Sequence, residues 1–243
     1  MKIVCDEKFY AIVDQLKNGF HEGFGIPVVL LPFDEHLVQK EQVACYDLLL
    51  IDNPALMKHL CDNGVIVETM DFCYATPVLV VRKDVPFSVT NITDFVANSE
   101  KNLRLAVASE HLTLSELVRN GLEKNQVKTQ GKNVQFQFQN KKQTKSQNLT
   151  SLLQQLKNNE IDIVACWDFD LSQILRNSEY TKSFQTIQFP PELDNTVPIL
   201  IGIAKDCTDY AVCCVFLDFI KSNIGQEIYK NNFQNIDNNS LKE

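Results

Sequence analysis

The chain has 243 residues, of which 44% are hydrophobic and 22% charged, and its formal net charge is −8. This composition excludes a disordered, collagen-like or coiled-coil protein. The acidic balance argues against nucleic-acid binding, which normally needs a basic face. No apolar run approaches the ~20 residues that span a bilayer, so we expect a protein that does not cross a membrane.

Eight cysteines are many for this length. No two of them have the spacing C-x-x-C, so the sequence predicts neither a zinc ribbon nor a thioredoxin-type pair. Most lie in apolar runs such as residues 163–166, where cysteine behaves as a small hydrophobic residue. Free core thiols suit a reducing compartment, and Met1 leads directly into an apolar run with no signal peptide. We expect a cytoplasmic location if Met1 is native, and a periplasmic or other extracytoplasmic one if a leader has been removed.

The first third of the chain alternates short β-type runs with segments of helical period. Residues 3–5 are a predicted strand, and apolar residues recur on one helical face over residues 9–20. Gly23 and Gly25 are predicted to end that helix before a second strand at residues 28–31.

The next run, residues 47–51, is largely apolar, as in a strand buried on both faces of a parallel sheet. Asn53 and Pro54 supply an N-cap and a first-turn proline for the helix that follows. Asn63 and Gly64 are predicted to close that helix.

The rest of the chain continues in the same way. Further strands are predicted at residues 77–81, 104–108, 134–138, 161–166 and 197–204. Thr113 and Glu116 form a capping box for one intervening helix, and leucines at helical spacing mark another at 149–156. Two more helices are predicted after residue 204. This alternation predicts an α/β fold with parallel sheets.

Sequence motifs for enzymes are missing from the chain. It contains no G-x-S-x-G, H-E-x-x-H, P-loop or G-x-G-x-x-G sequence, and its histidines form no ligand pair at i, i+4. We therefore predict no enzyme: no catalytic residue, no metal site and no cofactor. A thiol enzyme using Cys5 or Cys166 stays open as the weakest alternative.

Polar residues and helix starts follow several of the predicted strands. The candidate ligand-binding residues at these positions are Asp6, Glu7, Lys8, Asp34, Glu35, Asn53, Thr113 and Leu149. Open α/β sheets bind ligands at the carboxyl ends of strands, where helix N-termini direct free N–H groups outward. Each position alone is explained by helix capping. Together they predict a ligand cleft between two lobes.

Several stretches, in one order along nearly the whole chain, resemble type II periplasmic solute-binding proteins. The resemblance is strongest to the molybdate- and tungstate-binding proteins of ABC transporters. The stretches are residues 46–53 (YDLLLIDN), 77–83 (PVLVVRK), 104–108 (RLAVA), 148–164 and 216–233.

The resemblance implies a periplasmic-binding-protein-like α/β fold of two lobes joined by two crossing hinge strands. Each lobe would hold a mostly parallel sheet flanked by helices. Residues 1–84 and 195–243 would form lobe 1, and residues 85–194 lobe 2, the two closing on the ligand by hinge motion. The implied partners are a small-molecule or oxyanion ligand and an ABC permease, and we expect a monomer.

In the family, a ligand-binding serine follows each of the first two strands. The resemblance places Lys8, within residues 6–8, and Glu35, within residues 34–36, at about these two positions. A serine hydroxyl donates a hydrogen bond to an oxyanion, whereas an ionised carboxylate only accepts. We therefore predict weak or no molybdate binding, with Lys8 as a compensating cation and backbone N–H groups at Thr113 and Leu149. The family's ligand-binding tyrosine is replaced by Trp167, the only tryptophan, which either packs the hinge or faces the ligand.

Other interpretations stay open. Asp6, Asp34, Asp168 and Asp170 suit a cationic ligand or a hard metal ion. The lysine-rich residues 124–148 fit either a basic patch or a solvated edge. The alternative function is a cytoplasmic ligand sensor or interaction module that retains the fold without transport.

Overall fold

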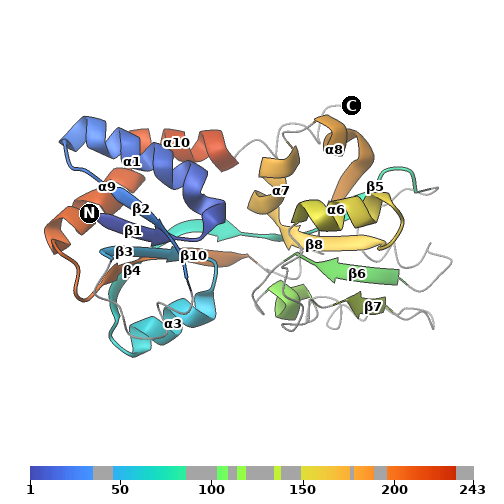
Figure 1. Cartoon of the computed structure of the whole chain (residues 1–243), viewed down its shortest axis with the longest axis horizontal. Helices are drawn as coiled ribbons and strands as arrows, with labels where there is room; N and C mark the ends of the chain where they lie inside the picture. The colour runs from blue at the N-terminus through green and yellow to red at the C-terminus, as the bar shows by residue number, and fades with distance from the viewer. Residues whose placement is uncertain are drawn as a thin grey trace. The chain divides into compact units, whose positions relative to one another are not determined.

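The computed structural model describes residues 1–34, 46–85, 103–108, 114–118, 134–137, 149–175, 178–188 and 196–233. The chain divides into two compact units (Figure 1). Unit 1 comprises Met1–Tyr74 and Pro198–Glu243, and unit 2 comprises Ala75–Val197. The lobe boundaries expected at residues 84 and 195 stay a prediction, whereas the chain passes between the compact units at 74/75 and 197/198.

Unit 1 contains a five-stranded sheet of order β2-β1-β3-β10-β4. Its strands are β1 (Lys2–Cys5), β2 (Val29–Pro32), β3 (Leu48–Ile51), β4 (Ile66–Ala75) and β10 (Val197–Ala204). β1 pairs in parallel with both β2 and β3, and β10 is antiparallel to β3. The first three strands therefore end at the same edge of the sheet.

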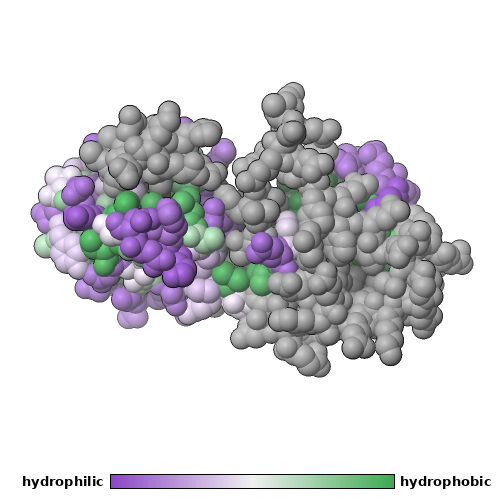
Figure 2. All heavy atoms as spheres, turned by 90° about the horizontal axis from the view of Figure 1, so that it is seen from below, coloured by the Kyte–Doolittle hydropathy of each residue, from purple (hydrophilic) through white to green (hydrophobic). Residues whose placement is uncertain are grey.

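The helices of unit 1 lie on both faces of this sheet. They are the 3-10 helix η1 (Glu7–Phe9), α1 (Tyr10–Phe24), α3 (Pro54–Asp62), α9 (Tyr210–Lys221) and α10 (Asn223–Phe233). Figure 1 shows α1, α9 and α10 over one face and α3 on the other. Figure 2 views the α3 side, where hydrophilic side chains cover much of the described surface of unit 1 with smaller hydrophobic areas between them. Among the described residues, no helix is both long and apolar enough to cross a membrane.

The helix limits predicted from capping residues are confirmed. α1 ends at Gly25, whose φ of +70° lies in the left-handed region that glycine adopts without strain, and its N–H donates to the His21 carbonyl. α3 begins after Asn53, whose side-chain oxygen accepts a hydrogen bond from the Leu56 N–H at 2.9 Å, and Pro54 occupies its first turn.

β3 lies at the centre of the hydrophobic core of unit 1. All four of its residues are at most 1% exposed, which explains why the sequence shows a continuous apolar run there and no alternation. Leu49 and Ile51 pack with Met57 and Leu60 of α3. Aromatic side chains of α1 and α9 pack together, with Phe20 and Phe216 edge to face at 5.0 Å.

Unit 2 contains a second five-stranded sheet, of order β7-β6-β8-β5-β9. Its strands are β5 (Pro77–Arg82), β6 (Leu103–Val107), β7 (Val134–Gln137), β8 (Ile163–Trp167) and β9 (Phe184–Gln188). β6 is parallel to β7 and β8, and β5 is antiparallel to β8 and β9. The helices include α6 (Leu149–Lys157), α7 (Asp168–Leu175) and α8 (Ser178–Ser183), together with the helical residues 114–118.

Two strands of the structure are not predicted from the sequence. β4 carries exposed residues at consecutive positions, including Val67, Glu68 and Thr69, so the alternation typical of a half-buried strand is missing. β9 follows directly on α8, without a turn signal between them. Both are the last strand of their sheet in the strand order, where the burial that produces a clear pattern is weakest.

In each unit, a buried carboxylate lies one residue before a central strand. Asp47 precedes β3 and accepts hydrogen bonds at 2.6 Å from the backbone N–H groups of Lys2 and Thr208. Asp162 precedes β8 and accepts from the backbone N–H of Arg104 at 3.0 Å and from its Nε at 2.9 Å. Each carboxylate therefore holds the start of its strand against a parallel neighbour, β1 or β6.

These bonds change the pKa of Asp47. Burial raises its pKa, but the hydrogen bonds from Thr208 and Lys2 together lower it by more than burial raises it. The net pKa therefore lies below the ordinary value. A lowered folded-state pKa stabilises the fold above the unfolded pKa of about 4, and that stabilisation is lost as the pH falls through the folded value.

We therefore expect Asp47→Ala to lower the free energy of unfolding by about 2–3 kcal/mol at pH 7, because it leaves two backbone donors without their acceptor. The loss should begin to shrink below about pH 4, where the unfolded carboxylate becomes protonated, and should shrink further as the pH falls through the lower folded-state pKa. Urea denaturation at several pH values measures both effects. Asp218→Ala, at an exposed carboxylate of α9, is the matched control and should change stability little. Equal losses at pH 7 and pH 3 would contradict the assignment.

Candidate functional site

The parallel strands of unit 1 bring several predicted ligand-binding residues to one edge of the sheet. Cys5, the last residue of β1, is aligned with Pro32 of β2 and with Leu50 of β3. The segments that follow these strands therefore leave the sheet at the same level. Asp6, Glu7 and Lys8 follow β1, Asp34 follows β2, and Asp52 and Asn53 follow β3.

Asp6 connects the ends of β1 and β3. Its Oδ2 accepts a hydrogen bond from the backbone N–H of Asp52 at 2.5 Å, and its own N–H donates to the Leu50 carbonyl at 3.1 Å. Asp6 precedes η1, but its side chain makes no capping hydrogen bond there. The interpretation of Asp6 as a simple helix start is therefore corrected, since its carboxylate reaches across to β3.

A second carboxylate, Asp52, forms an ion pair with Lys8. The Lys8 Nζ lies 2.5 Å from the Asp52 Oδ2, and the two side chains are 24% and 1% exposed. The second oxygen of Asp52, Oδ1, is buried and accepts no hydrogen bond. A buried polar atom without a partner is rare and costs free energy, and no group among the described residues donates to this oxygen.

We call Asp6, Lys8 and Asp52 the unit 1 cluster. With the neighbouring Glu7, these residues place three carboxylates and one ammonium group within one stretch of the sheet edge. The charge of Lys8 is already directed at Asp52, so it does not provide an unopposed cation for an anionic solute. Ionised carboxylates accept hydrogen bonds and repel anions.

The other predicted residues of unit 1 lie outside this cluster. Glu7 and Asp34 are exposed, and the side-chain oxygen of Asn53 caps α3. Glu35 lies outside the described residues.

In unit 2, Trp167 ends β8 and is 1% exposed. Its ring stacks on Phe169, with centroids 6.5 Å apart and planes 15° from parallel, so it packs in the interior of the unit. The indole N–H of Trp167 is buried and has no acceptor among the described residues. Trp167 therefore has a structural role and also carries an unused donor.

Asp168, next to Trp167, links β8 to the chain before β5. Its Oδ1 accepts from the N–H groups of Thr76 at 3.1 Å and Phe169 at 2.8 Å. Burial raises the pKa of Asp168 although these hydrogen bonds oppose the change. Leu149 begins α6 and packs partly against the core of unit 2, and Thr113 lies outside the described residues.

The alternative acidic set divides between the two units, with Asp6 and Asp34 in unit 1 and Asp168 and Asp170 in unit 2. Within the described parts of the chain, no group of three or more His, Cys, Asp and Glu residues is placed to hold a metal ion.

The cysteines that the structure describes form no disulfide bonds, and Cys5, Cys73, Cys166 and Cys213 among them are buried. Burial raises the pKa of Cys5 to about 12 and that of Cys166 well above its ordinary value. The nucleophile in thiol chemistry is the thiolate, so burial keeps both residues inert at neutral pH. The prediction of core thiols is confirmed for these buried cysteines, whereas Cys45 lies outside the described residues.

The site residue missed by the sequence analysis is Asp52. It lies inside the stretch 46–53 that carries the family resemblance, but the cap at Asn53 explains the start of α3 without it. The sequence pattern that could have indicated Asp52 is an acidic residue directly after a fully apolar strand. Burial makes a charge at such a position costly unless the charge is paired.

Two α/β units with sheets of this order, each flanked by helices, define the fold of periplasmic binding proteins, as the sequence predicts. The sequence profile of a family described as bacterial extracellular solute-binding protein matches residues 12–233. The chain belongs to this family. A comparison with curated proteins finds no match.

Solved structures agree with this fold. One, described as the substrate-binding domain of a molybdenum ABC transporter from Clostridium difficile, superposes with a TM-score of 0.72 at 15% identity and covers 96% of each chain. The periplasmic molybdate-binding protein of Azotobacter vinelandii gives 0.57 at 15% identity, covering 95% of this chain and 96% of its own. The spermidine/putrescine-binding protein PotD of Streptococcus pneumoniae gives 0.68 at 13% identity, covering 96% and 80%. The resemblance to molybdate-binding proteins predicted from sequence is thus confirmed for the fold.

The unit 1 cluster generates a prediction for stability. Lys8→Met should lower the free energy of unfolding by about 2 kcal/mol or more, because it leaves the buried Asp52 carboxylate without its cation. Asp52→Asn should cost less, since Lys8 is partly exposed and water can solvate it. The double variant Lys8→Met/Asp52→Asn should recover most of the loss of Lys8→Met.

Urea unfolding of the four proteins forms a double-mutant cycle that measures the coupling. Lys58→Met, in the exposed pair with Asp62, is the control and should cost at most about 0.5 kcal/mol. Strictly additive losses at Lys8 and Asp52 would show that the pair does not act as a unit.

Proposed function

We propose that this solute-binding protein captures a small solute through the unit 1 cluster and delivers it to an ABC permease. Capture is reversible and involves no covalent chemistry. Membership of the extracellular solute-binding family supports a permease partner and an extracytoplasmic location. Fold relatives described as parts of molybdenum and spermidine/putrescine ABC transporters support a transport role.

One observation supports an assignment of the chemical class of the solute. The Asp52 Oδ1 is a buried carboxylate oxygen without a hydrogen-bond partner, beside a Lys8 ammonium that Asp52 already pairs. This atom accepts a hydrogen bond and cannot donate one. The solute that fits the cluster therefore carries an N–H or O–H donor, as an amine, amide or polyol does.

An oxyanion of the molybdate type does not fit this cluster. Such an ion offers acceptors only, and it would meet the carboxylates of Asp6 and Asp52 with a single, already paired cation. Two like charges 4 Å apart repel by about 4 kcal/mol at an effective dielectric of 20. Molybdate binding should accordingly be weak or absent.

In unit 2, Trp167 is a second candidate contact. Its buried indole N–H lacks an acceptor and is suited to an oxygen of a solute. Leu149 and Thr113 stay predictions, each offering a backbone N–H near a helix start.

The direct test is a thermal-shift screen of amines, amino acids, polyols, carboxylates, oxyanions and divalent metals. A solute at 100 times its Kd adds about 2.7 kcal/mol of stability, which raises the Tm of a protein of this size by about 5–10 °C. We expect a hit among the amines, amino acids or polyols and none for molybdate. Isothermal titration of the hit then gives its affinity for the native protein.

The variant that tests the site is Asp52→Asn. It replaces one acceptor oxygen by an N–H donor, so affinity for the hit should fall about tenfold or more while the fold is retained. Asp218→Asn, in which the same change is made at an exposed position of α9, should bind like the native protein. Tight molybdate binding, or a hit unaffected by Asp52→Asn, would overturn the assignment of the cluster.

A second candidate function is a cytoplasmic ligand sensor that retains the fold without transport. The absence of disulfide bonds among the described cysteines favours it, since disulfides are rare in a reducing compartment. Fractionation of cells that express the native gene decides between the two. Recovery in the periplasmic or membrane-associated extracytoplasmic fraction supports transport, and recovery in the cytoplasm supports the sensor.

A further inference from the structure

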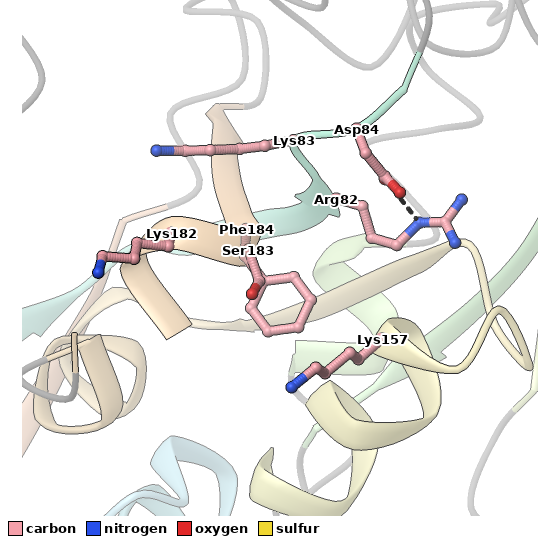
Figure 3. A pocket seen from close by; sticks show the side chains of 7 residues that line it. All are labelled: Arg82, Lys83, Asp84, Lys157, Lys182, Ser183 and Phe184. Atoms are coloured by element: carbon pink, nitrogen blue, oxygen red, sulfur yellow. Dashed lines mark ion pairs between the residues drawn. The ribbon is translucent and has the colours of Figure 1, made fainter. Parts of the chain in front are cut away.

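A separate basic cavity lies in unit 2, at a distance from Trp167. It has a volume of about 380 Å³ and is lined by Arg82, Lys83, Asp84, Lys157, Lys182, Ser183 and Phe184 (Figure 3). We call it the β5–β9 pocket. Its lining carries four cationic side chains and one carboxylate, in a chain whose net charge is −8.

The pocket is built where three elements end together. Arg82 is the last residue of β5 and is aligned with Phe184, the first residue of β9. The N–H of Lys83 donates to the Ser183 carbonyl at 3.0 Å, which fixes the chain after β5 against the end of α8. Lys157 is the last residue of α6.

The pocket lies at the opposite end of β5 from Trp167. Trp167 is aligned with Pro77, the first residue of β5, and Arg82 lies five positions further along the strand. At the rise of an extended strand this is about 16 Å. A ligand in the pocket would therefore not contact Trp167.

The cationic side chains come from different positions around the pocket. Figure 3 shows Lys83, Lys157 and Lys182 extending toward the left of the view and the guanidinium of Arg82 toward the right, with the ring of Phe184 near the middle. Phe184 is 4% exposed and stacks on Tyr180, so its ring is held in place at the base of the pocket. Lysines in a last helical turn interact favourably with the helix dipole, which accounts for Lys157 and Lys182 but not for Lys83 or Arg82.

The carboxylate in the pocket does not prevent anion binding. Asp84 pairs with the Arg82 Nε at 3.3 Å, and its side chain is 75% exposed. An exposed pair of this kind contributes about 0–1 kcal/mol, so an anion with more than one charge can take its place at the guanidinium.

From these features we infer that the β5–β9 pocket binds a small molecule carrying a diphosphate group. Several ammonium groups and one guanidinium suit a multiply charged phosphate, which lysine binds as a point charge and arginine through paired N–H donors. The volume exceeds what a single phosphate requires and falls within the range of small-molecule sites. The pocket shares no lining residue with the unit 1 cluster.

The probe for this site is inorganic pyrophosphate, titrated calorimetrically into the full chain at constant ionic strength. We expect saturable binding at one site, weaker binding of orthophosphate, and loss of affinity as salt is raised. The variant Lys83→Gln/Lys182→Gln removes two charges from the exposed rim and should weaken pyrophosphate binding about tenfold or more. Lys58→Gln on α3 removes a charge from an exposed position of unit 1 and should leave it unchanged.

Four outcomes would overturn the inference. One is no saturable binding of pyrophosphate, and another is an equal loss in Lys58→Gln, which would show a nonspecific charge effect. The third is binding that survives Lys83→Gln/Lys182→Gln but is lost in Lys8→Met/Asp52→Asn, which would place the anion at the unit 1 cluster. A hexaglutamate peptide is titrated in parallel. Tighter binding of that peptide than of pyrophosphate would assign the pocket to an acidic protein segment and also overturn the proposal.

Discussion

The two sheets depend on the same interaction, a buried carboxylate placed one residue before a central strand. Asp47 holds the first residue of β1 and the segment after β10 to the start of β3, and Asp162 holds Arg104 of β6 to the start of β8. A parallel pair has no tight turn to fix its register, because its strands are joined through distant crossover connections. The carboxylate supplies that missing constraint. The candidate ligand-binding residues follow the far ends of the same strands. The register set at one end therefore determines which of these residues lie next to each other at the other end.

Much of the fold can be predicted from the sequence because local physics determines it. The apolar run of β3, the Asn53 cap and the glycine at the end of α1 each act within a few residues, and each is found where the pattern indicates. β4 and β9 could not be predicted in this way. They are held by hydrogen bonds to strands distant in sequence, and their side chains do not alternate clearly between buried and exposed.

The candidate site was only partly predictable, for a related reason. Position after a strand indicates that Asp6 and Lys8 lie at the sheet edge, but it does not tell which side chain is buried or which one pairs with another. That depends on the alignment of β1 with β3, which brings Lys8 to Asp52 across 44 residues of chain. The basic pocket is harder still, because Lys83, Lys157 and Lys182 come from three separate segments, each of which resembles an ordinary solvated surface.

The buried thiols have a practical consequence for following the motions of the protein. Cys5 lies in the sheet of unit 1 and Cys166 in that of unit 2, both fully shielded from solvent. A thiol reagent modifies such a group only when the surrounding strands separate, so the modification rate reports local opening in the way that amide hydrogen exchange does. The modification rates of the two cysteines therefore report local opening in each unit separately. A ligand that stabilises only one unit would slow modification of the cysteine in that unit and leave the other rate unchanged.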